Sequence, residues 1–324
     1  MTAASSRPFR LLAVTTSVMV YLLIVVGGIV RITGSGLGCP DWPLCHGQVV
    51  PPADMAAIIE YTHRVVAALG GVLMVATLVL AWRDYRAQRW ITVPITASIA
   101  LLVVQVPLGG LIVVTELEPL AVAFHLGMAM LIFAGVLLTT VAAHAPAPGA
   151  APAHSGPRRP GYLWLLGVTL VAVFLLLLTG AFVVGTDSQL ACPDWPLCHG
   201  GLLPPPNSSP QVGLHLLHRY TVAANSILLA LVVIATLRLA GQQRALTRWA
   251  AVLGALFAVQ VVIGGVQVLL VIPTLWRIVH LAAASAVWGS LVVLAGLTLV
   301  GRAEPAARRS STPSEGMMAT PTSK

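Results

Sequence analysis

The chain has 324 residues, of which 57% are hydrophobic and only 9% are charged. Soluble domains carry about 25% charged residues, so the composition excludes an ordinary soluble protein and places most of the chain in a lipid membrane. The formal charge of +8 lies in loops beside apolar runs, which indicates membrane topology and argues against nucleic-acid binding.

Eight apolar runs reach the roughly 20 residues that a transmembrane helix needs. The first, from Leu11 to Val30, is longer than the apolar part of a signal peptide and lacks an Ala-x-Ala cleavage site. We therefore interpret it as an uncleaved helix. The predicted spans are 11–31, 58–82, 91–114, 120–143, 162–185, 212–239, 248–272 and 277–300.

A segment rich in Pro and Ala separates the first four spans from the last four. Residues 144–161 cannot build a core, so we expect a cytoplasmic linker there. The linker divides the chain into an N-terminal four-helix half, 1–143, and a C-terminal four-helix half, 162–301. Residues 302–324 are polar and rich in Pro and Ser, which predicts a disordered cytoplasmic tail.

The distribution of Arg and Lys predicts the orientation. All but four of the 18 Arg and Lys residues fall on the side that holds both termini. By the positive-inside rule both termini are cytoplasmic, and a bacterial cell membrane is the expected location. The four exceptions, at or just inside helix ends on the outer side, are Arg31, Arg64, Arg219 and Arg277.

The two halves are related by a sequence repeat. The nine residues Cys39–Gly47 recur identically as Cys192–Gly200, each time between the first and second span of a half. Because each half has an even number of spans, both halves run in the same direction and the repeat is parallel. The sequence therefore predicts an all-α membrane protein made of two tandem four-helix bundles, a fold that builds cofactor sites between facing helices.

Four histidines recur in this repeat inside the predicted spans. His63 and His218 lie near the outer ends of the second helix of each half, and His125 and His280 near the outer ends of the fourth. The two histidines of a half are therefore at similar depth, which suits a haem iron with an axial imidazole on each face. Two alternatives stay open: structural histidines bonded to neighbouring helices, and ligands of another metal.

Charged residues accompany the histidines of the second helices. Arg64 and Arg219 follow them directly, and either pair with haem propionates or extend toward the membrane interface. Glu60 lies three residues before His63 on the same helix face. There a carboxylate stabilises positive charge or acts as a base toward water, and the alternative is a solvated glutamate at a helix start. The matching residue in the second half is His215, to which the sequence assigns no role.

Each loop of the repeat contains two cysteines separated by five residues. Cys39 and Cys45, and likewise Cys192 and Cys198, are expected to form disulfides in an oxidising exterior. Such disulfides are either structural or redox-active. A metal site of Cys39, Cys45 and His46 is a third reading, for which no fourth ligand is evident. The sequence assigns no role to the histidine that follows the second cysteine of each loop, His46 and His199.

Taken together, these features resemble the haem A synthase family. The resemblance rests on eight spans in two halves, a Cys-x5-Cys loop in each half, the Glu-x-x-His-Arg motif at residues 60–64 and the four histidines. It covers nearly the whole chain apart from the linker and the tail. It implies an oxidoreductase acting on a CH or CH2 group, which converts the C8 methyl of haem O into the formyl group of haem A by two water-derived hydroxylations. The product would serve cytochrome c oxidase.

The resemblance also implies a role for each site residue. In the first half, His63 and His125 would hold the substrate haem O, and Glu60 would be the catalytic carboxylate. The haem b cofactor of the second half would be held by the matching pair, His218 and His280. The cysteine pair of the first loop would be the one implicated in activity.

The expected partners are haem O from a haem O synthase, membrane lipid and an external electron acceptor. The sequence shows no flavin or nucleotide motif, so a quinone, a haem protein or oxygen must take the electrons. A homo-oligomer is compatible with these features. Two other functions stay open, an electron-transferring dihaem membrane cytochrome and a quinone-linked thiol oxidase. The first predicts a symmetric protein, which the difference between Glu60 and His215 disfavours, and the second leaves four matched histidines without a role.

Overall fold

The computed structural model describes residues 5–145, 159–241 and 243–300. These residues form eight long α-helices, and all eight are long and apolar enough to cross a membrane. The predicted all-α membrane fold with eight spans is therefore confirmed. The elements are α1 (Arg7–Ile32), α2 (Met55–Tyr85), α3 (Arg89–Val114), α4 (Pro119–His144), α5 (Pro160–Gly185), the short 3-10 helix η1 (Ser188–Leu190), α6 (Pro210–Leu239), α7 (Arg244–Leu269) and α8 (Thr274–Val300).

Several helices begin at polar caps that lie outside the apolar runs. The side chains of Ser6, Asp54 and Glu118 accept hydrogen bonds from backbone N–H groups in the first turns of α1, α2 and α4. The helices therefore start up to four residues before the predicted spans. Two helix ends differ from the predicted ones by three residues: α2 continues to Tyr85, and α7 stops at Leu269. The end of α7 is set by Val271 and Ile272, whose left-handed φ angles of 60° and 59° end a right-handed helix.

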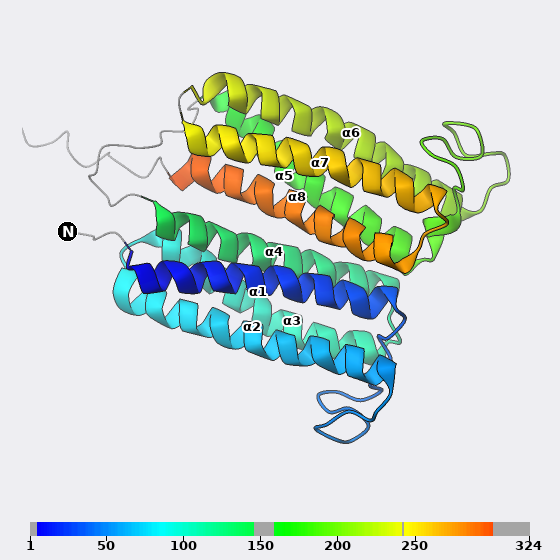
Figure 1. Cartoon of the computed structure of the whole chain (residues 1–324), viewed down its shortest axis with the longest axis horizontal. Helices are drawn as coiled ribbons and strands as arrows, with labels where there is room; N and C mark the ends of the chain where they lie inside the picture. Colours follow the sequence, from blue (N-terminus) through cyan, green and yellow to red (C-terminus); the bar gives the residue numbers. More distant parts are fainter. Residues whose placement is uncertain (1–4, 146–158, 242, 301–324) are drawn as a thin grey trace, which may run out of the picture.

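The helices form two groups of four, α1–α4 and α5–α8, which lie side by side (Figure 1). The two loops that follow α1 and α5 project from the same end of the molecule (Figure 1). The start of α1 and the ends of the helices that flank the predicted linker lie at the opposite end (Figure 1). Both groups therefore run in the same direction, as the parallel repeat predicts. Most of the predicted linker and all of the predicted tail lie outside the described residues.

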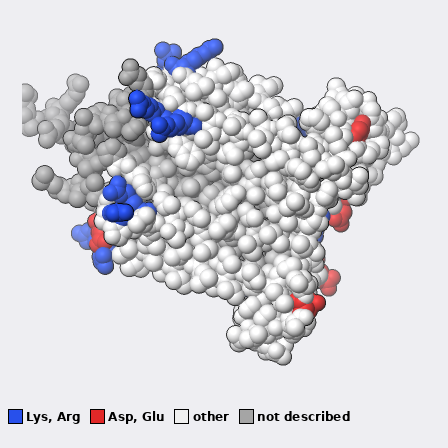
Figure 2. Space-filling view, viewed as in Figure 1, with Lys and Arg blue, Asp and Glu red and all other residues white. Residues whose placement is uncertain are grey.

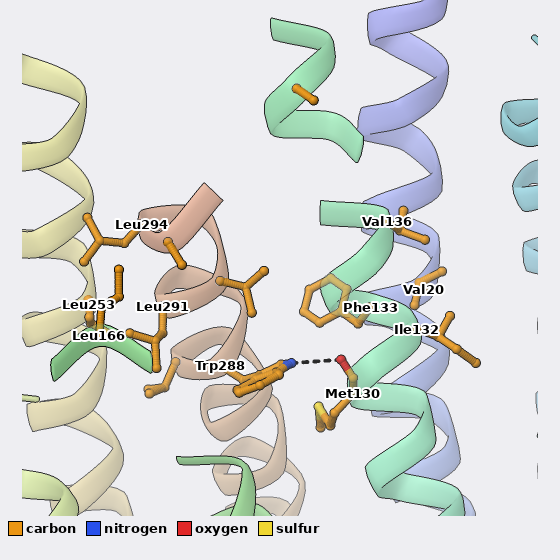
Figure 3. Close-up of a cluster of buried hydrophobic side chains, with 14 of the residues drawn as sticks. Val20, Met130, Ile132, Phe133, Val136, Leu166, Leu253, Trp288, Leu291 and Leu294 are labelled. Carbon is orange, nitrogen blue, oxygen red and sulfur yellow. Dashed lines mark hydrogen bonds between the residues drawn. The ribbon is translucent and has the colours of Figure 1, made fainter. Parts of the chain in front are cut away.

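The seam between the two groups is formed by α1 and α4 on one side and by α5 and α8 on the other. Trp288 of α8 is 4% exposed, and its indole Nε1 donates to the carbonyl of Met130 on α4 at 2.9 Å (Figure 3). One residue further along α8, a Cβ on Gly289 would lie 2.9 Å from Cε1 of Phe133, so only glycine permits this approach. Close packing of small and large residues thus joins the two halves.

Charged side chains gather at the two ends of the helices, and the middle of the molecule is apolar. Figure 2 shows most of the visible Lys and Arg at the end where α1 begins, and most of the visible Asp and Glu at the end with the cysteine loops. In the sequence this corresponds to arginines in the last turns of α2 and α6 and the first turns of α1, α3 and α7. An apolar belt between two polar ends is the surface of a membrane-spanning protein.

Candidate functional site

Each cysteine loop is closed by a disulfide, as predicted. Cys39 is bonded to Cys45 and Cys192 to Cys198, and all four residues are fully buried. Because both thiols are used in the disulfide, the reading of Cys39, Cys45 and His46 as a metal site is wrong. Across 5–145, 159–241 and 243–300, no group of three or more His, Cys, Asp or Glu residues is placed to hold a metal ion.

An aspartate organises the turn inside each loop. Asp41 accepts hydrogen bonds from the backbone N–H groups of His46 at 2.6 Å and Gly47 at 2.7 Å. The Gly47 N–H, followed by that of His46, lowers the pKa of Asp41 below its usual 3.8. Asp194 accepts the same two bonds in the second loop. The His46 ring closes the turn, because its Nε2 donates to the Gly38 carbonyl at 3.0 Å.

A tryptophan places each loop on the third helix of its half. A Cβ on Gly110 of α3 would lie 3.1 Å from Cδ2 of Trp42, and a Cβ on Gly265 of α7 would lie 2.9 Å from the same atom of Trp195. Only glycine lets the indole lie so close to these helices. Trp42 remains 45% exposed and Trp195 42% exposed, so each ring covers its helix with one face and leaves the other accessible.

Arg64 fastens the first loop to α2. Its Nη1 donates to the carbonyls of Asp41 at 2.9 Å and Leu44 at 2.5 Å, and its Nη2 to the carbonyl of Cys39 at 3.3 Å. This arginine therefore satisfies backbone acceptors that the short disulfide loop cannot satisfy itself. Pairing of Arg64 with a haem propionate stays a prediction.

Arg219 fastens the second loop to α6 in the same way. It donates to the carbonyl of Cys192 at 3.1 Å and also to that of Leu197. The conformation of the loop and its attachment are thus repeated in the two halves. Its pairing with a propionate likewise stays a prediction.

Glu60 breaks the symmetry of the two halves. It is 4% exposed, so the alternative of a solvated glutamate at a helix start is wrong. Its Oε1 accepts from Nη2 of Arg64 at 2.6 Å, and its Oε2 accepts from the Cys39 N–H at 2.8 Å. The carboxylate is therefore held between the loop and the charge of the arginine that binds the loop.

His215 occupies the corresponding place in the second half. It is 6% exposed, and its Nδ1 is buried without a hydrogen-bond partner. Among residues 159–241 and 243–300, no ion pair is present, so Arg219 binds loop carbonyls without a carboxylate within 4.0 Å. At these two positions, the loop ends of the two halves thus differ by one buried negative charge.

The four repeated histidines lie on the second and fourth helices of the two halves. His63 lies on α2 and His125 on α4, and the matching His218 and His280 lie on α6 and α8. Each pair therefore joins the second and fourth helices of its bundle, near the end that carries the cysteine loop.

A glycine of the preceding helix lies beside each of these rings. A Cβ added at the four glycines would lie 3.0–3.3 Å from the ring Cε1 atom, closer than an ordinary contact. A side chain at any of these four positions would occupy the space beside the ring. Glycine is therefore needed for the histidine rings to keep these positions. The pairs are Gly27 with His63, Gly109 with His125, Gly180 with His218, and Gly264 with His280.

The ring nitrogens fit the donor set of a haem. Nδ1 of His63, His125 and His280 is buried without a hydrogen-bond partner, which is costly unless a further group satisfies the ring. Nδ1 of His218 has a partner, Oγ1 of Thr179 at 3.0 Å, a contact of the kind that orients a metal-bound imidazole. Two facing imidazoles between helices are the axial ligands that haem iron takes. The residues of each half therefore fit a haem.

Two glutamines support the fourth helices near these histidines. The Gln105 amide donates to the His125 carbonyl at 3.1 Å, and the Gln260 amide donates to Nε2 of His280 at 3.2 Å. The repeat matches these glutamines, but the structure gives them different acceptors.

Several residues of the site were missed by sequence reasoning. Gly27 and Gly180 recur at the same offset as the cysteine loops, so the repeat contained the signal that would have found them. Asp41, Asp194 and Trp42 lie inside the repeated nine residues, so the repeat also pointed to them. No sequence signal identifies the loop carbonyls that Arg64 binds, because backbone acceptors are present at every residue.

Comparison with known proteins gives consistent matches. A family model described as COX15-CtaA, cytochrome oxidase assembly protein, matches residues 10–292. A protein named Heme A synthase from Symbiobacterium thermophilum is 34% identical over 307 residues, which cover 91% of this chain and 97% of the relative. Proteins of the same name from Alkalihalophilus pseudofirmus and Halalkalibacterium halodurans are each 31% identical, over 81% and 82% of this chain and 87% and 88% of their own lengths.

Proposed function

The chain belongs to the COX15-CtaA family of cytochrome oxidase assembly proteins, and from this premise we propose that it acts as a haem A synthase. In this function it is an integral membrane oxidoreductase that oxidises a methyl group of haem O to a formyl group, which gives haem A. The observation that carries the proposal is the pair of matched histidine sites, of which one alone has a buried carboxylate, Glu60.

The two histidine pairs receive different haems in this proposal. His63 and His125 hold the substrate haem O, because Glu60 lies on the same face of α2 one turn away from His63. His218 and His280 hold a haem b, which supplies a one-electron relay when bound. The unpartnered ring nitrogens and the glycines beside the rings support both assignments.

The reaction at the C8 methyl removes four electrons in two steps. In the first, a C–H bond is replaced by a bond to the oxygen of water, giving a hydroxymethyl group, two electrons and two protons. In the second, the same exchange gives a geminal diol, two more electrons and two more protons. Loss of one water from the diol leaves the formyl group. The electrons pass to an external acceptor of the quinone or haem-protein class.

Glu60 contributes charge and a proton acceptor to these steps. Removal of electrons from the methyl carbon makes it positive, and a buried carboxylate nearby stabilises that charge more than water would. The same group accepts the proton of the attacking water. Arg64 and the Cys39 N–H orient the carboxylate through charge-assisted hydrogen bonds of 2.6 and 2.8 Å.

The cysteine loop limits access of water to this site. It is attached to α2 by Arg64 and to α3 by Trp42, and it lies at the end of the bundle where the histidines are found. Exclusion of bulk water strengthens the interaction between Glu60 and the developing charge. The disulfide keeps the loop in the conformation that these contacts require.

The protein lies in the cell membrane with both termini cytoplasmic and both loops outside. The arginines gathered at the end opposite the loops support this orientation (Figure 2). Haem O, with its apolar tail, enters from the lipid and is supplied by a haem O synthase.

The proposal is tested by extracting pigments from cells that make haem O, with and without this protein. Haem A is expected by chromatography only when the protein is present, and its absence would refute the proposed function. Glu60→Ala is expected to abolish haem A while haem remains bound. Glu60→Gln separates the two uses of Glu60, because the amide keeps an acceptor for the Cys39 N–H but cannot stabilise charge. An active Glu60→Gln variant would assign Glu60 to holding the loop.

A further inference from the structure

At the outer ends of the two halves, the charged groups of the cysteine loop and of its attachment to the second helix are matched. Arg64 and Arg219 bind the carbonyls of the first and second loop. Asp41 and Asp194 accept equivalent backbone hydrogen bonds, and each interacts with the arginine of its own half. These groups therefore contribute nearly equal electrostatic potentials to the two histidine sites.

The buried position that differs is 60 in the first half and 215 in the second, whereas the other unmatched charged residues at this end are at least partly exposed. Glu60 neutralises Arg64 through the 2.6 Å ion pair. His215 is neutral when its buried Nδ1 has no partner to stabilise a charge, so Arg219 lacks the ion-pair partner that Arg64 has in Glu60. The second histidine pair therefore has one buried negative charge fewer beside it than the first pair.

Both positions are one turn away from the histidine that faces the bound haem. Residues three apart on a helix have Cβ atoms about 5–6 Å from each other, and position 215 stands in this relation to His218 as position 60 does to His63. Both positions are buried, at 4% and 6% exposure, so solvent screens a charge there only weakly.

We propose that His215, in the place that Glu60 holds in the first half, raises the reduction potential of the haem in the second half and so directs electrons toward it. This inference rests on the proposed function. A nearby carboxylate stabilises the ferric form of a haem, which carries one more positive charge than the ferrous form. The half without that carboxylate therefore holds its electron more tightly.

The electron transfer that this difference favours is a simple exchange. One electron would leave the haem O held by the first half, which is oxidised, and would be accepted by a haem b held by His218 and His280, which is reduced. No atom moves in this step. The external quinone or haem protein would then be reduced by that electron. The carboxylate of Glu60 remains in the first half, where the substrate becomes positively charged.

The test is a potentiometric titration of haem b in the second half alone. A His63→Ala background prevents bis-histidine ligation in the first half, so one low-spin haem is followed by its optical spectrum. His215→Glu is expected to lower the equilibrium constant for reduction about tenfold, which is about 59 mV for one electron. The new carboxylate lies four residues before Arg219, as Glu60 lies before Arg64, so the pair is expected to form and the variant to fold. His215→Gln, which adds no charge, is the matched control and is expected to leave the potential unchanged.

Equal potentials in the wild-type and His215→Glu proteins would overturn the inference. If His215→Glu does not retain haem, the reverse change decides: in a His218→Ala background loaded with haem b, Glu60→Gln is expected to raise the equilibrium constant about tenfold, and no change would overturn the inference. The two failures remain distinguishable. Absence of a low-spin spectrum from both single-site proteins contradicts the proposed function, whereas a normal spectrum with unshifted potentials contradicts only the role of His215.

Discussion

Replacement of Arg64 by Leu is expected to destabilise the protein far more than the matched change Arg219→Leu. Each arginine binds loop carbonyls, so each variant loses hydrogen bonds from a charged donor, worth about 1.5–3 kcal/mol. Arg64→Leu additionally leaves Glu60 as a buried charge without its partner, because the Glu60 side chain is 6% exposed. Removal of one member of a buried ion pair costs about 3–5 kcal/mol. The two variants are therefore expected to differ by about 3 kcal/mol.

The assay is equilibrium unfolding in mixed micelles with increasing SDS, followed by near-ultraviolet circular dichroism. A difference of 3 kcal/mol corresponds to about a hundredfold in the unfolding constant, at 1.4 kcal/mol for each factor of ten. The double variant Arg64→Leu with Glu60→Gln is the control, because it removes the charge that Arg64→Leu leaves behind. It is expected to be more stable than Arg64→Leu alone.

Equal losses in Arg64→Leu and Arg219→Leu would refute this reasoning. That result would mean that Glu60 does not depend on Arg64 for its burial. The difference between Glu60 and His215 would then not affect stability, although the hydrogen bonds to the loops would remain.

Two further predictions concern the rings and the loops. Gly27→Ala is expected to displace the His63 ring by a few tenths of an ångström, since the new Cβ would lie 3.0 Å from its Cε1. The haem content of the first half, measured by pyridine haemochrome, should fall, whereas Gly167→Ala, with nothing within 4 Å, should change nothing. Asp41→Ala is expected to speed reduction of the first disulfide by a phosphine and to leave the second unchanged, as judged by mass spectrometry; equal rates would contradict the role of Asp41. Because the pKa of Asp41 is lowered, the protection that it gives is present above pH 3.8 and is lost only as the pH falls through the lowered value.

The sequence predicted the number of helices and the two bundles, because each of these follows from a repeated pattern. Apolar runs specify membrane helices directly, since no other element except a closed barrel satisfies its backbone in lipid. An exact repeat then specifies which residues are equivalent. The helix ends were less accurate, because polar caps such as Ser6 and the left-handed residues Val271 and Ile272 depend on local hydrogen bonds.

The contacts of Glu60 and Arg64 could not be predicted from the sequence. Their spacing of four residues on a helix permits an ion pair, but it also permits the solvated glutamate and the interfacial arginine. The disulfide loop decides between these alternatives, because it folds back over the end of α2, buries Glu60 and binds the half-buried Arg64 through its carbonyls. Such burial depends on the path of a loop in three dimensions, and no periodicity in the chain encodes it.

The central claim, that each half binds a haem through its own histidine pair, is tested most directly by the optical spectrum of the purified protein. The wild-type protein is expected to show low-spin, bis-histidine haem. The combined change His218→Ala and His280→Ala should remove the haem b of the second half and leave a site in the first half that still binds added haem O. No low-spin haem in the wild-type protein, or an unchanged spectrum after both replacements, would contradict the account.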